Sequence, residues 1–425
     1  MARRQVALSA ALDLGSLVIA LGIASIIVFE TPWPWHFRTD PTALVGSLLL
    51  GAVVGIYISQ RSAGQEVPRP SYGRAFSMFG VAMTISSLTL VFSRSYFSRG
   101  YLAWTSASWL ALALTHRAIR RRRPWSENLV IVTAEKELID HLLDAPHANV
   151  TQVLDPAGPV PDQPLPLGVT LAVDLRAVLS DEMARFVSSS SLAGYPMRSL
   201  VTTYEEHTGR LAIVHLHEGW ELTVPLRGRG PYVKTKRIAD TLAVLLAAPV
   251  ALVLGAIIAA AIRVDSRGPV IFKQRRIGLE GRPFTLYKFR TMYSNNEGER
   301  EARFAARGDD RLTRVGRLLR RLRVDELPQL WNVLRGDLSL VGPRPEQGPF
   351  VDRFSETIPF YTHRHLVRPG LTGWAQVNFG YADGHADTIE KLSYDLYYVK
   401  HVGVWLDLEV LGRSIWTILS GFGAR

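Results

Sequence analysis

The sequence predicts a membrane protein in three parts: four hydrophobic helices, a small α/β domain, and a mixed α/β domain that returns to the membrane. Three observations support this fold class. Four apolar stretches of about the length needed to span a bilayer occupy residues 1–123. Residues 124–230 alternate short apolar strands with helical patterns. Residues 231–425 begin with a fifth apolar stretch, which contains a proline.

The four N-terminal stretches predict a transmembrane four-helix bundle. They cover approximately residues 11–29, 42–58, 75–92 and 101–118. The arginines that fall on one side of a four-span arrangement are Arg3, Arg4, Arg61, Arg69, Arg74, Arg117 and those at 120–123. Those that fall on the other side are Arg38, Arg94 and Arg99. By the positive-inside rule, both ends of this block are expected in the cytoplasm.

Residues 124–230 have the β-α order of a reduced Rossmann-like domain. We expect strands over 128–133 and 169–174, with a helix over 135–143 between them. The turn after the first strand has the sequence Ala-Glu-Lys-Glu and lacks the Gly-x-Gly-x-x-Gly pattern that brings the backbone close to a pyrophosphate. We therefore interpret this part as a degenerate Rossmann-like domain with a structural or regulatory role.

The fifth apolar stretch, residues 242–262, is long enough to span a bilayer, but two features favour a helix that enters one leaflet and returns. Pro249 lies inside the stretch and would break or kink a helix. Lysine and arginine flank the stretch on both sides, whereas a true span should show an asymmetry. The sequence therefore predicts a re-entrant helix over residues 236–263 with its break at Pro249.

The chain has 425 residues, a formal net charge of +11 and no cysteine. The absence of cysteine excludes disulfides, thiolate nucleophiles and cysteine-bound zinc. Nucleic acid is one partner for such a basic chain, but the neighbouring hydrophobic stretches favour anionic membrane lipid and a nucleotide diphosphate substrate. We therefore expect no nucleic-acid partner, and we leave open whether the chain forms a homodimer.

The most informative feature is a pair of adjacent carboxylates, Asp325 and Glu326, between two predicted helices. Residues 311–323 have the pattern of a basic amphipathic helix. The next helix is predicted to begin at Asp325, with Pro328 in its first turn and Gly336 as its end. Asp325 would then lie near a helix N-terminus, where free backbone N–H groups favour anions. Together with the nearby arginines, this arrangement predicts a site for phosphate chemistry.

Taken alone, the two carboxylates are more simply explained as a helix cap and a dipole-compensating residue. An ordered set of motifs around them reverses that preference: Lys-Arg-Ile-Ala-Asp at 236–240, Gly-Pro-Val-Ile-Phe-Lys-Gln at 268–274, Arg-Ile-Gly at 276–278, Lys-Phe-Arg-Thr-Met at 288–292, Gly-Pro-Arg-Pro at 342–345 and Arg-Pro-Gly-Leu-Thr-Gly-Trp at 368–374. From residue 232 to about 420 the chain resembles the bacterial sugar transferases. These are polyprenyl-phosphate glycosyl-1-phosphate transferases of the monotopic phosphoglycosyltransferase fold, here in the large form with N-terminal transmembrane helices and a Rossmann-like domain.

The resemblance implies an enzyme that transfers a hexose-1-phosphate, with glucose or galactose favoured, from a UDP-sugar to undecaprenyl (polyprenyl) phosphate and releases UMP. This would be the first membrane step of exopolysaccharide or related glycan synthesis. Asp325 would be the nucleophile, forming a covalent aspartyl-phosphosugar intermediate, and Glu326 would bind Mg²⁺. The expected location is the bacterial inner (cytoplasmic) membrane, with the catalytic domain, residues 231–425, facing the cytoplasm.

Seven further residues are expected to bind the substrate: Lys288, Arg290, Arg320, Pro343, Arg344, Pro345 and Arg368. Guanidinium groups bind phosphate oxygens in pairs, which makes Arg320, Arg344 and Arg368 candidate phosphate contacts. Pro343 and Pro345 restrict the backbone on either side of Arg344. Arg320 lies in a helix that is basic throughout, so contact with lipid headgroups is an alternative role for it.

Two other functions fit parts of the sequence. A membrane-bound nucleotide-sugar dehydratase also joins membrane spans to a Rossmann-like domain, but it needs a dinucleotide-binding loop that residues 134–137 do not provide. A non-catalytic partner in polysaccharide assembly would have no need of both Asp325 and Glu326. Close to the C-terminus, residues 404–419 have the pattern of a helix that lies in the membrane interface.

Overall fold

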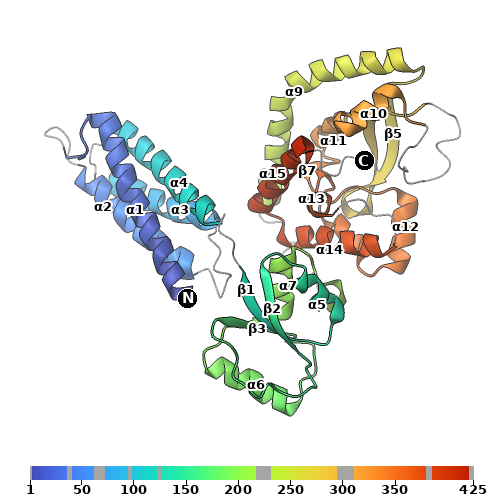
Figure 1. Cartoon of the computed structure of the whole chain (residues 1–425). Coiled ribbons are helices and arrows are strands. Elements are labelled where there is room, and N and C mark those ends of the chain that lie inside the picture. Colours follow the sequence, from blue (N-terminus) through green and yellow to red (C-terminus); the bar gives the residue numbers. More distant parts are fainter. Residues whose placement is uncertain are drawn as a thin grey trace. The chain divides into compact units, whose positions relative to one another are not determined.

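The structure is a computed structural model that describes residues 2–35, 41–61, 72–93, 98–121, 126–216, 231–293, 311–379 and 385–420 (Figure 1). These residues divide into two compact units. One unit contains the N-terminal helices, and the other contains the two α/β regions that follow.

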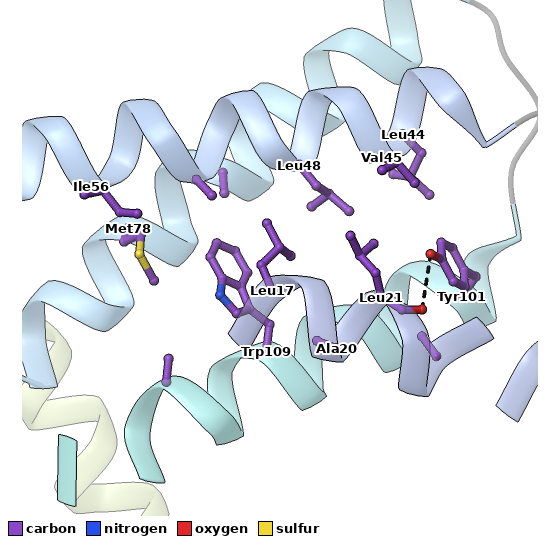
Figure 2. Packing of buried hydrophobic residues seen from close by; sticks show 14 of the residues in the cluster. Leu17, Ala20, Leu21, Leu44, Val45, Leu48, Ile56, Met78, Tyr101 and Trp109 are labelled. Carbon is purple, nitrogen blue, oxygen red and sulfur yellow. Dashed lines mark hydrogen bonds between the residues drawn. The ribbon is translucent and has the colours of Figure 1, made fainter. Parts of the chain in front are cut away.

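Four helices form the N-terminal unit: α1 (Ala2–Phe29), α2 (Thr42–Arg61), α3 (Tyr72–Ser93) and α4 (Arg99–Arg121). Each of them contains one of the apolar stretches seen in the sequence. They pack around a single buried cluster, in which Leu17 of α1, Leu48 of α2 and Trp109 of α4 lie close together (Figure 2). At one end of the cluster the Tyr101 hydroxyl donates a hydrogen bond of 3.4 Å to the carbonyl oxygen of Leu21.

A buried charged group joins α1 to α4. Asp13 of α1 accepts hydrogen bonds of 2.5 and 2.7 Å from the two terminal nitrogens of Arg117 and lies 2.9 Å from Nε2 of His116. Its backbone carbonyl accepts a bond of 3.1 Å from Trp109 Nε1. A carboxylate that is shielded from water is tolerated only with such partners. These contacts therefore hold α4 in one register against α1.

Among the residues that the structure describes, three helices are long and apolar enough to cross a membrane: Leu8–Phe29, Tyr72–Phe92 and Tyr232–Asp265. The apolar helix over Thr42–Ile58 is shorter. Side chains such as Val91 and Phe92 are 71% and 82% exposed, respectively, so the outer surface of the bundle is itself apolar. Water-soluble proteins rarely expose such surfaces. The chain is a membrane protein with an attached α/β part.

The first α/β region contains a four-stranded sheet in the order β2-β1-β3-β4. Its elements are β1 (Glu127–Val132), α5 (Lys136–Leu143), β2 (Ala148–Leu154), β3 (Val169–Val173), α6 (Asp181–Leu192), β4 (Met197–Ser199), α7 (Leu200–Thr208) and the 3-10 turn η1 (Ile213–His215). The two strands and the helix predicted from the sequence are confirmed as β1, β3 and α5. Residues of α5 and α7, including Leu138 and Tyr204, pack on Leu129 and Ile131 of the central strand.

The second α/β region begins with α9 (Pro231–Asp265), a helix of 35 residues with Pro249 inside it. The sequence predicted a helix interrupted at this proline, whereas the structure has one continuous helix that bends sharply (Figure 1). A proline removes one intrahelical hydrogen bond and crowds the preceding turn, and sharp bends in helices are commonly caused in this way.

The other elements of this region surround the predicted site. The hairpin β5 (Ile271–Ile277) and β6 (Pro283–Phe289) is antiparallel, and β7 (Ser339–Val341) pairs in parallel with β8 (Gly370–Thr372). The helices are α10 (Arg314–Arg321), α11 (Gln329–Arg335), α12 (Gly348–Thr357), α13 (Trp374–Asn378), α14 (His385–His401) and α15 (Val404–Ser420). The 3-10 turns are η2 (Leu279–Gly281), η3 (Val324–Glu326) and η4 (Tyr361–Leu366).

Two buried clusters attach α9 to this region. Val244 packs with residues of β6 and α11, including Leu286 and Val333. Further along the helix, Ile258 and Ile262 pack with the end of β6 and with α10. The membrane helix therefore supports the strands and helices that carry the predicted site.

Candidate active site

Asp325 and Glu326 lie in the 3-10 turn η3, between α10 and α11. The sequence predicted that a helix begins at Asp325, and this is wrong, because α11 begins only at Gln329. The physical reason is Pro328, which has no N–H to donate to the carbonyl oxygen of Val324. That oxygen accepts a bond of 3.2 Å from the nitrogen of Leu327 instead, and the turn tightens to 3-10 geometry.

The residue before this turn has an unusual backbone conformation. Arg323 has a φ angle of 57°, in the left-handed region that residues other than glycine adopt rarely. Its conformation ends α10 and directs the chain into η3. Such strain is characteristic of functional sites, where the surrounding structure holds a residue in place. Arg323 thus contributes to the position of the two carboxylates through its backbone.

Glu326 is held by two cations from separate parts of the chain. Its Oε1 atom accepts a hydrogen bond of 3.1 Å from Nζ of Lys288, on β6, and one of 2.8 Å from Nη2 of Arg344, in the loop after β7. Burial raises the pKa of Glu326, but the nearby charges of Arg344 and Lys288 outweigh it and hold the pKa well below its usual range. Glu326 is therefore an anion at any physiological pH.

Asp325 is in the opposite situation. Its side chain is buried, and burial together with the neighbouring Glu326 raises its pKa, although Lys288, Arg320 and Arg344 partly counteract this. Two neighbouring carboxyl groups whose pKa values are pushed apart usually have different chemical roles. The permanently charged Glu326 suits a cation, whereas the poorly stabilised carboxylate of Asp325 suits a nucleophile.

The other arginines predicted to bind substrate do not all lie beside the two carboxylates. Arg320 donates a bond of 2.9 Å from Nε to the hydroxyl of Thr291, and its charge lowers the pKa of Asp325. Arg290 bonds instead to the backbone and side-chain oxygens of Ser266 at the end of α9, at 2.7 and 2.8 Å. Arg368 donates from Nε to a backbone oxygen at the end of α11, at 3.2 Å. The contacts described for Arg290 are thus those of a residue that fixes α9.

The loop that carries Arg344 is fixed along its whole length. Four consecutive carbonyl oxygens, those of residues 343–346, each accept a hydrogen bond. In order, the donors are Gly370 N (2.9 Å), Arg364 Nη2 (3.0 Å), Arg276 Nη1 (3.0 Å) and Ile277 N (2.9 Å). Pro343 and Pro345 also restrict the backbone on either side of Arg344. The guanidinium is therefore presented by a rigid support, as preorganised binding of phosphate requires.

Several supporting residues were not found from the sequence. The fully buried Asn332 of α11 donates to the carbonyl oxygen of Thr285 at 2.7 Å and accepts from the nitrogen of Tyr287 at 3.2 Å, which ties α11 to β6. Arg237 of α9 donates to the carbonyl oxygen of Leu334 at 2.6 Å and so caps the end of α11. Asn332 shares its helix face with Gln329 and Arg335, so no local pattern singled it out. No local signal identified the partner of Arg237.

The donor set around Glu326 fits a magnesium ion that is shared with a substrate. Among the residues that the structure describes, no group of three or more His, Cys, Asp or Glu could enclose a metal. Magnesium is commonly bound by one or two carboxylates together with the phosphates of the substrate. Glu326, with Asp325 beside it, would supply the protein's part of such a site.

Comparisons with known proteins identify relatives of this chain. The family model described as bacterial sugar transferase matches residues 232–421. A UDP-N-acetylgalactosamine-undecaprenyl-phosphate N-acetylgalactosaminephosphotransferase of Aeromonas hydrophila is 48% identical to this chain. The aligned segment covers 58% of this chain and 58% of that relative's length. A UDP-glucose:undecaprenyl-phosphate glucose-1-phosphate transferase of Caulobacter vibrioides is 43% identical over 46% of this chain and 75% of its own length. The protein of the same name from Escherichia coli is 29% identical over 91% of this chain and 89% of its own length.

Proposed function

This chain belongs to the bacterial sugar transferase family, and we propose that it transfers a sugar 1-phosphate from a UDP-sugar to undecaprenyl phosphate with release of UMP. The observation that carries the proposal is the adjacent carboxylate pair whose pKa values are shifted in opposite directions, beside the rigidly supported Arg344. Such a pair provides one group to react and one to bind a cation. The relatives named above act on the same two classes of substrate.

The reaction proceeds in two displacements. The carboxylate of Asp325 attacks the phosphorus atom that carries the sugar, the bond from that phosphorus to the bridging oxygen breaks, and UMP leaves with the electron pair. An oxygen of undecaprenyl phosphate then attacks the aspartyl-phosphosugar intermediate, and the carboxylate of Asp325 is restored. Two easier transfers replace one difficult transfer.

The remaining residues bind and orient the phosphates. Arg344 and Arg320 neutralise phosphate oxygens, with Arg344 held by its loop and Arg320 by its bond to Thr291. Lys288 keeps Glu326 ionised and in place. Glu326 would hold Mg²⁺, and a bound Mg²⁺ would supply positive charge to the pyrophosphate.

The topology that suits this reaction has α1–α4 as four spans and α9 as a helix that enters the cytoplasmic leaflet and returns. Its support is the arginine asymmetry of the N-terminal region, the basic flanks of α9 and the bend in that helix (Figure 1). Both substrates then meet at Asp325, because the nucleotide sugar is cytoplasmic and the acceptor phosphate lies at the bilayer surface. The exposed apolar residues on α9, such as Leu246 and Leu252, face lipid in this arrangement.

The direct test is incubation of the purified full-length protein with undecaprenyl phosphate, magnesium and each of a panel of radiolabelled UDP-sugars. UDP-N-acetylgalactosamine and UDP-glucose belong in the panel because the relatives named above differ in the sugar that they transfer. UDP-galactose belongs in it because the motifs of this chain also favour that sugar. We expect one or more of these donors to give lipid-linked label and equimolar UMP. Without lipid acceptor, the label should become bound to the protein.

The variant Asp325→Asn should abolish both UMP release and the labelled protein adduct. Full activity in this variant would eliminate the covalent mechanism while leaving the overall reaction intact. Label on NAD(H)-dependent dehydrated sugar products, or no turnover of any UDP-sugar, would eliminate the overall reaction itself.

A further inference from the structure

The helix α14 (His385–His401) has two faces that serve different parts of the second unit (Figure 1). Residues 391, 395 and 398 lie on one face, since they are spaced by four and three positions. Residues 390, 394, 397 and 401 form a second row with the same spacing. The first row contacts the segment that leads to Arg344, and the second row contacts the Rossmann-like region and the segment attached to it.

The first face of α14 supports the loop that carries Arg344. Nζ of Lys391 pairs with Oε1 of Glu346 at 2.5 Å. Asp395, which is 1% exposed, accepts a bond of 2.6 Å from Nη2 of Arg364, and the same nitrogen donates to the carbonyl oxygen of Arg344 at 3.0 Å. One guanidinium nitrogen therefore connects α14 directly to the backbone of the predicted phosphate-binding arginine.

The second face of α14 docks against α7 and the residues that follow it. Arg210 donates to the hydroxyl of Tyr394 at 2.8 Å and pairs with Glu390 at 2.7 Å. At the end of the helix, the carboxylate of Glu205 accepts bonds of 2.8 and 2.9 Å from Lys400 and lies 3.1 Å from Nε2 of His401. Glu205 is 4% exposed, so this ion pair is shielded from water on the carboxylate side.

A second connection runs from the residue that follows α7 to the segment next to strand β8. Trp374 lies two residues after the end of β8. Its Nε1 donates a hydrogen bond of 2.7 Å to the carbonyl oxygen of Gly209. Gly209 has a φ angle of 67°, and a β-carbon there would lie 2.9 Å from the Trp374 ring. β8 in turn pairs with β7, and Gly370 donates to the carbonyl oxygen of Pro343. The positive φ angle and the close approach of the Trp374 ring leave room only for glycine at position 209.

We propose that the Rossmann-like region is a positioning domain that acts through α14: the docking of Glu205 on Lys400 and His401 sets the position of the Arg344 loop. This inference rests on the function proposed above for Arg344. Glu205, Lys400 and Asp395 touch no substrate, so they are positioning residues. The region thereby has a role that does not require it to bind a nucleotide of its own, in keeping with its missing glycine loop.

The chain offers a closely matched pair of variants for the test. Glu205→Gln removes the charge that docks α14, while Lys400 and His401 remain partly exposed and can be hydrated. Glu206→Gln makes the same change one position further along α7. The carboxylate of Glu206 pairs at 2.5 Å with Arg198 of β4, within the Rossmann-like region. Both variants are measured as full-length proteins in lipid nanodiscs.

Two measurements distinguish positioning from a general loss of stability. In steady-state UMP release, we expect Glu205→Gln to raise KM for the UDP-sugar by about threefold or more, which is the size typical of indirect coupling, while Glu206→Gln leaves KM unchanged. In hydrogen–deuterium exchange, Glu205→Gln should accelerate exchange of peptides that contain Gly342 and Gly370. Lys400→Gln should reproduce both effects, and the double variant should be no worse than either single one.

Equal KM values and equal exchange rates in Glu205→Gln and Glu206→Gln would overturn the inference, and so would a lower unfolding temperature in Glu205→Gln without a change in KM or in loop exchange. A wild-type protein that releases no UMP would instead refute the proposed function. The exchange measurement still decides the positioning question in that case, because it requires no turnover.

Discussion

Replacing the two adjacent carboxyl groups by amides should change the stability of the protein in opposite directions. Glu326→Gln removes the partner of two buried or partly buried cations, Lys288 and Arg344, and should destabilise the fold. Asp325→Asn removes a buried carboxylate whose ionised form the fold disfavours, as its raised pKa indicates. That variant should therefore unfold at a higher temperature than the wild type, although we expect it to be inactive. Sites that carry function often reduce stability in this way.

The magnitude for Glu326→Gln follows from its contacts. Removing one partner of a buried ion pair costs about 3–5 kcal/mol, and the lower end applies here because the side chain of Arg344 is 35% exposed and can reach water. In a unit of this size, about 1 kcal/mol shifts the midpoint of thermal unfolding by roughly 2–4 °C. The expected decrease is thus about 6 °C or more. For Asp325→Asn the structure gives the direction of the change.

The assay is thermal unfolding of the purified proteins in one detergent, without nucleotide or magnesium. The control is Glu356→Gln on the exposed surface of α12.

The change in stability caused by Asp325→Asn depends on pH. Since the pKa of Asp325 is raised in the folded state, its ionisation reduces stability only at pH values above the ordinary carboxyl range, about 3.9 for aspartate. The advantage of Asp325→Asn should therefore be present at neutral pH and disappear in acid. A lower unfolding temperature for Asp325→Asn at neutral pH would refute the reasoning.

Three further predictions concern activity and topology. Lys288→Gln removes a cation that lowers the pKa of Asp325, so the acidic limb of the pH–rate profile for UMP release should move to higher pH. An unmoved limb, which is the result expected for exposed Lys136→Gln, would contradict this. Glu326→Gln should need far more Mg²⁺ for half-maximal UMP release, and magnesium-independent turnover by the wild type would exclude that role. Single cysteines introduced at exposed Lys234 and Arg267, near the two ends of α9, should both react only from the cytoplasmic side; labelling of either one from outside intact cells would mean that α9 spans the membrane.

Local sequence patterns were sufficient to predict helices and strands with a regular apolar pattern, and a loop whose prolines restrict the backbone. The apolar stretches predicted the helices α1–α4, and the short apolar run over residues 128–133 predicted β1. The paired prolines around Arg344 predicted a rigid loop, and each carbonyl oxygen of residues 343–346 is indeed bonded. These features depend on residues within a few positions of one another, so the sequence carries their signal directly.

The sequence could not identify contacts that form only after the chain has folded. Lys288 and Glu326 are 38 positions apart, and Arg364 and Asp395 are 31 apart. Neither pair has a local pattern that points to its partner. The predicted start of α11 is wrong for a different reason: a proline is usually tolerated in the first turn of a helix, but Pro328 is not neutral here. Its missing N–H in fact excludes the bond to Val324 that a helix starting at Asp325 would use.

The membrane helix α9 contributes to the shape of the site as well as to its location. The turn with the two carboxylates is fixed by the helices on either side, and α9 contacts both of them. Arg237 of α9 bonds to the carbonyl oxygens at the end of α11. On the other side, the nitrogen of Val315 in α10 donates to the carboxylate of Asp265 at 3.1 Å. A shift of α9 in the bilayer would therefore move both flanks of Asp325.

This dependence gives a physical reason for joining the membrane helix and the site in one rigid assembly. α10 approaches the end of β6 so closely that a β-carbon at Gly316 would lie 2.0 Å from the carbonyl oxygen of Thr291, which leaves no room for adjustment. In the proposed topology, a rigid connection from α9 through α10 would keep Asp325 at a constant depth relative to lipid. The proposed acceptor phosphate is confined to the bilayer surface, so a fixed depth would replace part of the search that a soluble enzyme has to make.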